Sequence, residues 1–130
     1  MQNIHPFVLG HVVGAALVGA VAGPLIDGQA AIIVAAVLVG GALVSSLMCR
    51  LWPGWDAAAW KIWPVAVLAN PAMLAALGFM AGDWQCVVGL RGGWNCLAAA
   101  IALVAAGFCL LPPVGGLLWR RWKRRGVPAA

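Results

Sequence analysis

The sequence contains no glutamate, no threonine and no tyrosine, and its 130 residues include only eight basic and three acidic side chains. General acid–base catalysis needs a carboxylate, histidine or lysine held beside a substrate. The three acidic residues are aspartates in predicted loops, and no third group is available to orient a serine–histidine pair. These absences remove the usual catalytic constellations, and we expect that the protein is not an enzyme.

What the sequence has in abundance is apolar residues, which make up 65% of the chain and give a mean hydropathy of +1.00. A soluble domain of this size leaves a large part of its surface in water, so it cannot bury so much apolar surface. A lipid bilayer is the alternative solvent. We therefore expect an integral, multi-pass membrane protein with one membrane domain that covers residues 1–130.

Four apolar windows are long enough to cross a bilayer, whose hydrocarbon core is about 30 Å thick. None of them contains Asp, Lys or Arg. Because backbone polar groups in lipid must be bonded within the chain, and no alternating pattern is present, helices are favoured over barrel strands. The sequence thus predicts an all-α integral membrane protein with four transmembrane helices and short loops, at residues 7–26, 30–49, 62–81 and 94–111.

Basic residues are distributed unevenly between the two sides that four spans create. One side collects Arg50, Lys61 and the five basic residues of the tail, whereas the other side has only Arg91. Cytoplasmic loops carry the excess of Lys and Arg, so both termini are predicted in the cytoplasm. Six arginines against two lysines, with much Ala, Gly and Val, are typical of a GC-rich bacterium, which would make this the bacterial inner (plasma) membrane.

The stretch from Gly82 to Cys96 repeats a short pattern, Trp-Gln-Cys and then Trp-Asn-Cys ten residues later. In the predicted topology this loop faces the oxidising exterior. A zinc site would need four ligands and the loop has no histidine, and a redox dithiol usually has Cys-x-x-Cys spacing. We therefore expect a disulfide between Cys86 and Cys96, with free thiols as the main alternative.

The polar residues inside the predicted spans are His11, Ser45, Ser46 and Asn70. Such groups are candidates for function by default. His11 and the two serines would lie at a similar depth in antiparallel neighbours, so a hydrogen bond within the bundle is expected. The alternative is that His11 is the axial ligand of a haem or a chlorophyll-type pigment, which the small neighbours Gly10 and Gly14 would allow to approach.

Asn70 comes directly before Pro71, near the middle of the third window. Proline removes one helix hydrogen bond, so a packing kink is expected there. A broken helix at this depth is also how many transporters build a binding site. In length and number of spans the chain resembles the small multidrug-resistance exporters and the small fluoride channels, which would imply a homo-oligomeric transporter or channel. The exporter pattern places a Glu in the first span, however, and this sequence has no Glu.

The chain after the fourth window is basic and rich in tryptophan. Pro112 and Pro113 are expected to end the regular helix, so that residues 112–130 form an interfacial segment. Anionic headgroups attract such a segment by about 1 kcal/mol per basic residue, and the interleaved tryptophans favour lipid over nucleic acid. The residues expected to contact headgroups are Arg120, Arg121, Trp122, Lys123, Arg124 and Arg125.

Small residues recur at four-residue spacing in three of the windows. These rows include Gly10 with Gly14, Gly19 with Gly23, Ala36 with Gly40, and Ala98 with Ala102 and Ala106. Such rows let helix backbones approach closely, within one chain or against another subunit. We therefore expect a non-catalytic accessory, assembly or stabilising subunit of a larger membrane complex. Its expected partners are other membrane protein subunits and anionic lipids, and a homo-oligomer is compatible with the same faces.

Overall fold

The chain is seen in a computed structural model that describes residues 4–26 and 30–126, and these residues form helices and no strand. In chain order the elements are α1 (Pro6–Ile26), α2 (Ala30–Leu51), α3 (Ala59–Leu68), α4 (Pro71–Gly82), α5 (Trp84–Val87), the 3₁₀ helix η1 (Trp94–Cys96) and α6 (Leu97–Arg125). Asp27, which lies in the first predicted outer loop, and residues 127–130 of the basic tail lie outside the described residues.

Three of the described helices, α1, α2 and α6, are long and apolar enough to cross a membrane. A fourth candidate exists if α3 and α4 count as one span, because the two helices follow each other closely and meet at a bend of 67°. The prediction of an all-helical chain with several helices of membrane-spanning length and composition is therefore confirmed for the described residues.

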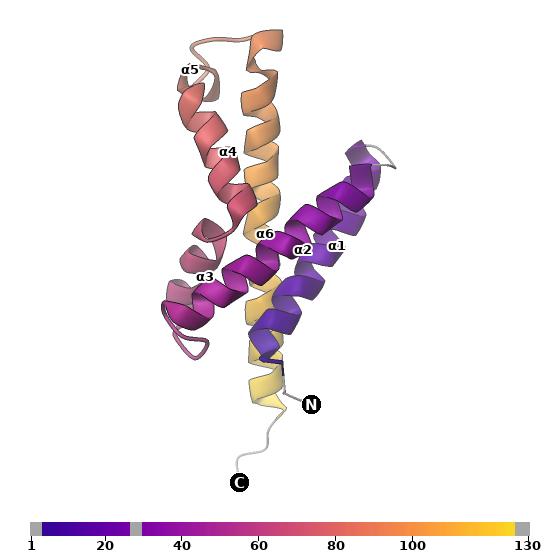
Figure 1. The fold of residues 1–130 in the computed structure, drawn as a ribbon, viewed down its shortest axis with the longest axis vertical. Helices are drawn as coiled ribbons and strands as arrows, with labels where there is room; N and C mark the ends of the chain where they lie inside the picture. The colour runs from indigo at the N-terminus through magenta and orange to yellow at the C-terminus, as the bar shows by residue number, and fades with distance from the viewer. Residues whose placement is uncertain (1–3, 27–29, 127–130) are drawn as a thin grey trace.

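The helices are arranged around α1, which packs extensively against both α2 and α6 (Figure 1). The start of α1, the α2–α3 connection and the end of α6 lie at one end of the molecule, and the α4–α6 connection lies at the other. From the first end toward the second, the α1–α2 hairpin diverges from α4 and α6, so that the two helix pairs resemble the arms of a V.

Glycines on α1 allow its backbone to touch both of its neighbours. A Cβ atom added at Gly19 would lie 2.6 Å from the Ala35 Cα of α2, and one added at Gly23 would collide with Ala31. Toward the other end of α1, a Cβ added at Gly10 would lie 2.5 Å from the Trp119 Cβ of α6. The small-residue rows of α1 are thus used inside this chain, where they bring helix backbones into direct contact.

The expectation that Pro112 and Pro113 end the fourth helix is wrong, because α6 continues through both prolines to Arg125. Each proline removes only one backbone hydrogen bond, and both rings are buried. The helix is supported at this point by α1, since Gly14 faces the Pro112 carbonyl and Gly116 faces Phe7. In apolar surroundings a continuous helix also leaves fewer unbonded backbone groups than an extended segment would.

The buried residues form two clusters, and most of them are small. The larger cluster contains Ala15, Leu38, Ala42, Val67, Met73, Ala76, Ala102, Ala106 and Cys109. The smaller one, at the end where the chain starts, contains Phe7, Cys49, Ile62 and Ala66. Many large apolar side chains of α1, α2 and α6 are nevertheless exposed, among them Leu17, Val21, Ile32, Ile33, Ile101 and Leu103.

The glycine contact between α1 and α2 predicts the effect of a large side chain at Gly19. Gly19→Leu should lower the free energy of unfolding by about 2 to 3 kcal/mol, because the added side chain meets the backbone of Ala35 rather than a flexible side chain. Gly78→Leu is the matched control, since no heavy atom lies within 4 Å of a Cβ at Gly78. Denaturant unfolding of the two variants in mild detergent measures the difference, and equal stabilities would contradict this account of the packing.

Candidate functional site

The structure brings His11 of α1 together with the two serines of α2. The His11 Nδ1 and the Ser46 Oγ are 3.1 Å apart, and the Ser45 Oγ lies 3.5 Å from both ring nitrogens. The Ser45 hydroxyl also donates to the Ala42 carbonyl at 3.2 Å. All three polar side chains are buried, and their polar groups bond to one another or to the backbone. This cluster is a hydrogen-bonded link between α1 and α2.

The helix surface that a flat macrocycle would need beside His11 is occupied by α6. Gly10 packs against Trp119, and a Cβ added at Gly14 would lie 3.1 Å from the Pro112 carbonyl oxygen. The ring of Phe7, which packs against Gly116 of α6, also lies near His11, with 5.5 Å between the two ring centroids. The glycines that were expected to admit a haem or pigment therefore serve helix packing, and this geometry does not fit axial ligation by His11.

Asn70 lies at the break between α3 and α4, where it is completely buried. Its Oδ1 accepts a hydrogen bond from the Ala72 N–H at 2.9 Å and so caps the start of α4, whose first residue is Pro71. Gly41 of α2 packs directly on the Asn70 amide, and a Cβ there would collide with Oδ1. The Asn70 Nδ2 has no hydrogen-bond partner among the described residues. The expected kink is thus a capped break that ends one helix and starts another.

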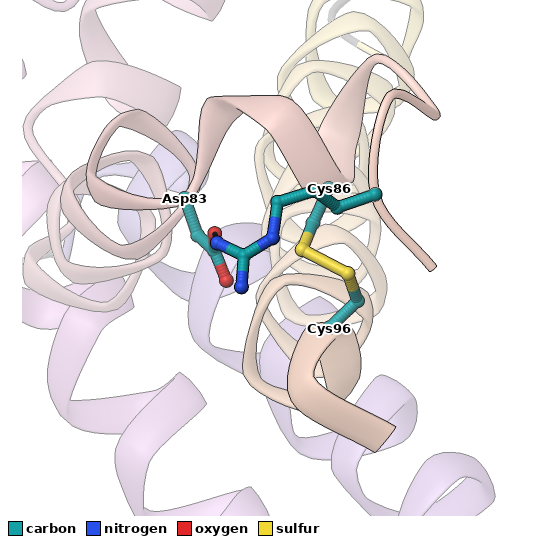
Figure 2. The surroundings of a disulfide bond; sticks show 4 residues. Asp83, Cys86 and Cys96 are labelled. Atoms are coloured by element: carbon teal, nitrogen blue, oxygen red, sulfur yellow. Dashed lines mark ion pairs between the residues drawn. A yellow bond between two sulfur atoms is a disulfide. The ribbon is translucent and has the colours of Figure 1, made fainter. Parts of the chain in front are cut away.

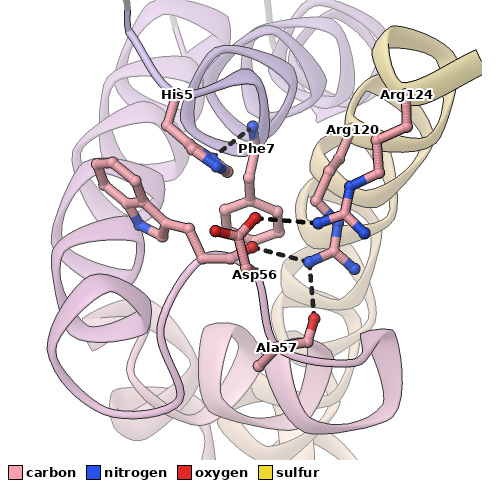
Figure 3. A network of polar contacts seen from close by, with 7 residues as sticks. His5, Phe7, Asp56, Ala57, Arg120 and Arg124 are labelled. Atoms are coloured by element: carbon pink, nitrogen blue, oxygen red, sulfur yellow. Dashed lines mark hydrogen bonds and ion pairs between the residues drawn. The ribbon is translucent and has the colours of Figure 1, made fainter. Parts of the chain in front are cut away.

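Arg120 does not extend from the basic end of α6 toward headgroups, as the sequence led us to expect. Its side chain turns inward, leaving only 8% of the residue exposed. Figure 3 shows its guanidinium between α6 and the α2–α3 connection, where Nη1 donates to the Trp55 and Ala57 carbonyls at 2.8 Å each. Two charge-assisted hydrogen bonds therefore attach the last turns of α6 to this loop.

Trp55, in the α2–α3 connection, contacts three different helix ends. Its ring stacks on His5, with centroids 4.4 Å apart, and the Arg50 guanidinium lies 5.3 Å from the ring centroid. Its indole N–H donates to the Ser46 carbonyl at 3.4 Å. Because its own carbonyl accepts from Arg120, Trp55 connects the start of α1, the end of α2 and the end of α6.

His5 caps the start of α1 with its side chain, since its Nδ1 accepts a hydrogen bond from the Phe7 N–H at 3.3 Å (Figure 3). Burial lowers the pKa of His5 below its ordinary value, and the nearby Arg120 and Arg124 add to this effect while Asp56 opposes it. The neutral imidazole that this favours is the form that can accept at Nδ1. Arg124 itself pairs with Asp56 at 3.0 Å on the exposed surface, where such a pair contributes about 0 to 1 kcal/mol.

Cys86 and Cys96 form the expected disulfide at the opposite end, with sulfur atoms 2.04 Å apart and Cα atoms 5.4 Å apart (Figure 2). The bond joins α5 to η1 and so fastens the end of α4 to the start of α6. Gly89 and Gly93 have φ angles of +78° and +88°, which a glycine adopts without strain in the turn between the cysteines. Among the described residues no group of three or more His, Cys, Asp or Glu side chains could hold a metal ion.

An apolar cleft of about 500 Å³ lies between α2 and α6, in the half of the molecule where the hairpin diverges. Its walls include Ile33, Val37 and Leu38 of α2 and Ile101, Val104 and Phe108 of α6. No charged, amide or hydroxyl side chain lines it. Such a cleft can accommodate an apolar chain or helix, and it offers no group for catalysis.

No family model, curated protein or solved structure matches the chain. What the protein does is therefore inferred from three features of its own geometry: the inward-facing polar clusters, the apolar cleft and the cationic end of α6.

The two bonds from Arg120 predict that this arginine stabilises the fold. Arg120→Met should lower the free energy of unfolding by about 2 to 4 kcal/mol, because both charge-assisted hydrogen bonds are lost and two carbonyls lose their partner. Arg121→Met, which removes the same charge from an exposed position, should change it by less than about 0.5 kcal/mol. Unfolding in detergent free of anionic lipid measures both, and equal losses would show that Arg120 has no special role.

The disulfide predicts a thiol count and a stability change. Without reductant, the denatured chain should expose two reactive thiols, Cys49 and Cys109, and after reduction it should expose four. Replacing Cys86 and Cys96 by serine should lower the free energy of unfolding by about 2 to 3 kcal/mol, because the short loop is no longer closed in the unfolded chain. Maleimide labelling read by mass spectrometry gives the count, and four thiols without reductant would contradict the bond.

Proposed function

We propose that the chain is a non-catalytic accessory, assembly or stabilising subunit of a larger membrane protein complex. The observation that carries this proposal is the apolar cleft between α2 and α6, which the chain itself leaves open. Close packing is the main source of attraction between helices in lipid, so an unfilled cleft of this kind favours entry of a further helix. The occupant that we propose is a transmembrane helix of a partner subunit.

Glycines that the chain leaves uncovered support the same proposal. No heavy atom lies within 4 Å of a Cβ added at Gly40 of α2, Gly78 of α4 or Gly107 of α6. The glycines of α1, by contrast, are covered by α2 and α6. The small residues thus divide into a set that closes this fold and a set that leaves helix backbones accessible from outside.

The buried polar groups also favour a structural role over a catalytic one. His11 is engaged with Ser45 and Ser46, and the Oδ1 of Asn70 caps α4. A general base has to reach a substrate, and these groups are enclosed by the chain's own helices.

For the topology we propose four spans, with α3 and α4 together forming the third, and with both termini in the cytoplasm of a bacterial host whose inner membrane holds the protein. The excess of Lys and Arg on one side supports this orientation. So does the arrangement in Figure 1, where the start of α1 and the end of α6 lie at the same end as the α2–α3 connection.

The proposal is tested by purifying the chain in mild detergent from its own membrane and measuring the native mass and composition of the particle. We expect a mass far above 13.4 kDa, with other polypeptides in fixed ratio. Val37→Trp, which fills the cleft, should lower recovery of the partner about fivefold or more, because overpacking an interface costs about 1 to 3 kcal/mol.

Val21→Trp is the matched control, since Val21 is 68% exposed on α1 and does not line the cleft. This variant should retain the partner. Loss of the partner from both variants, or from neither, would contradict docking at the cleft, even where a large particle is recovered.

The alternative function is a small homo-oligomeric transporter or channel centred on Asn70 and Pro71. The 67° break favours it, as does the buried Asn70 Nδ2 that has no partner among the described residues. In that case the native particle would contain only copies of this chain. The purified protein would move ions or small solutes across liposomes, and Asn70→Ala would change that flux.

A further inference from the structure

The end of α6 forms a second pocket that is unlike the apolar cleft. It has a volume of about 390 Å³, and four arginines, Arg120, Arg121, Arg124 and Arg125, contribute to its walls. These residues are spaced so that Arg120 and Arg124 lie one turn apart, as do Arg121 and Arg125, and the two pairs occupy adjacent rows on one side of the helix.

The four guanidinium groups are not balanced by the protein. Arg124 is paired with Asp56, and Arg120 is bonded to backbone carbonyls, which carry no net charge. Within the part of the chain that the structure describes, Asp56 is the carboxylate paired at this end, and Arg121 and Arg125 make no hydrogen bond or ion pair. The pocket therefore carries an excess of positive charge and unused hydrogen-bond donors. Both would stabilise a bound anion.

On the N-terminal side of the arginines along α6, the walls of the same pocket are apolar. Val114, Leu117 and Leu118 complete most of its wall, one to two turns earlier on the same side of α6. Val114 and Leu118 are 41% and 61% exposed, and they belong to the stretch of α6 that is apolar enough to cross a membrane. Along the helix axis the pocket thus changes from exposed aliphatic side chains to cationic ones.

We propose that this pocket binds one anionic phospholipid, with its phosphate accepting hydrogen bonds from Arg121 and Arg125 and an acyl chain lying along Val114 and Leu118. A phosphate group matches the planar, multiple donors of arginine. A soluble phosphate or a nucleic acid would use the cationic half of the pocket and leave the aliphatic half in contact with water. This inference concerns a different surface from the α2–α6 cleft and does not depend on the proposed function.

Only four of the six residues that the sequence predicted to contact headgroups line this pocket. Trp122 and Lys123 do not line the pocket: Trp122 lies instead beside the groove between α6 and α1, and the Lys123 Nζ is 6.0 Å from the Trp122 ring centroid. Arg120 reaches the pocket with the part of its side chain that the α2–α3 loop leaves accessible. Arg121 and Arg125 are the pocket arginines that bond to none of the described residues, so all of their donors are available to a ligand.

The test is a titration of the full-length chain, stripped of lipid in mild detergent, with phosphatidylglycerol or phosphatidylcholine of the same acyl chains, followed by native mass spectrometry. We expect one phosphatidylglycerol per chain, bound at least tenfold more tightly than phosphatidylcholine. Replacing Arg121 and Arg125 by glutamine should weaken phosphatidylglycerol binding by roughly 25-fold, since each basic residue near a surface contributes about fivefold.

The matched control replaces Lys61 and Lys123 by glutamine, which removes the same charge at the same end of the molecule but outside the pocket. It should weaken binding less than about threefold, because only the general attraction is reduced. Equal losses in the two double variants would overturn the site and leave only diffuse attraction. Circular dichroism of both variants establishes that the helices are retained.

Two further measurements distinguish binding of a whole phospholipid from binding of a soluble phosphate or a nucleic acid. Leu118→Gln, which changes no charge, should weaken phosphatidylglycerol binding, whereas glycerol 3-phosphate alone should bind weakly and equally to this variant and to the original chain. Glycerol phosphate that competes as well as the whole lipid would overturn the proposal in favour of a soluble anion. A short oligonucleotide that displaces the lipid at equal phosphate concentration would overturn it in favour of nucleic acid.

Discussion

The structure depends on the close approach of α1 to two other helices along its glycines. Gly19 lies on the backbone of Ala35 in α2, and Gly10 lies on Trp119 and its neighbours in α6. Apolar helices in lipid have no hydrophobic reason to associate, so the attraction has to come from many dispersion contacts at short range. Because one helix makes both contacts, the relative position of α2 and α6 is determined through α1, and these two helices touch each other little directly.

The polar contacts follow from this placement. With α1 against α2, His11 faces Ser46 at hydrogen-bond distance, and with α1 against α6, the last turns of α6 lie beside the α2–α3 loop so that Arg120 can bond to its carbonyls. Toward the other end the α1–α2 hairpin diverges from α4 and α6, which are held together by small side chains and by the bond between Cys86 and Cys96. One half of the molecule is therefore closed by polar bonds and the other is open and apolar.

Most of the helices and the cysteine pair could be predicted from the sequence, because long uncharged windows form helices in lipid and two loop cysteines without further metal ligands tend to pair in an oxidising compartment. The end of α6 could not be predicted, because the rule that proline ends a helix holds for chains whose freed carbonyl can bond to water, whereas here α1 covers the prolines.

The inward position of Arg120 could have been predicted from the spacing of the residues on the packed face of α6, but not from the number of basic residues in the tail. Apart from Pro112, which is buried beside Pro113, the buried residues of α6 follow alternating steps of three and four residues: Ala99, Ala102, Ala106, Cys109, Pro113, Gly116 and Arg120. This spacing places Arg120 on the packed face of α6. The prediction from the sequence treated all the basic residues of the tail as solvated and therefore placed Arg120 wrongly.

The polar bonds of the closed half and the apolar cleft of the open half lie in different parts of the molecule. Asn70 lies at the junction, where it caps α4 and rests on Gly41 of α2, and the hydrogen bonds among His11, Ser45 and Ser46 and around Trp55 lie toward the closed end. The cleft between α2 and α6 lies on the other side of this junction and has apolar walls. A helix that entered the cleft would therefore meet aliphatic and aromatic side chains and would break none of the polar bonds described. Breaking a buried hydrogen bond costs about 1 to 3 kcal/mol, and the cleft walls make no such bond, so the polar contacts hold the closed half in its geometry more firmly than the open half is held.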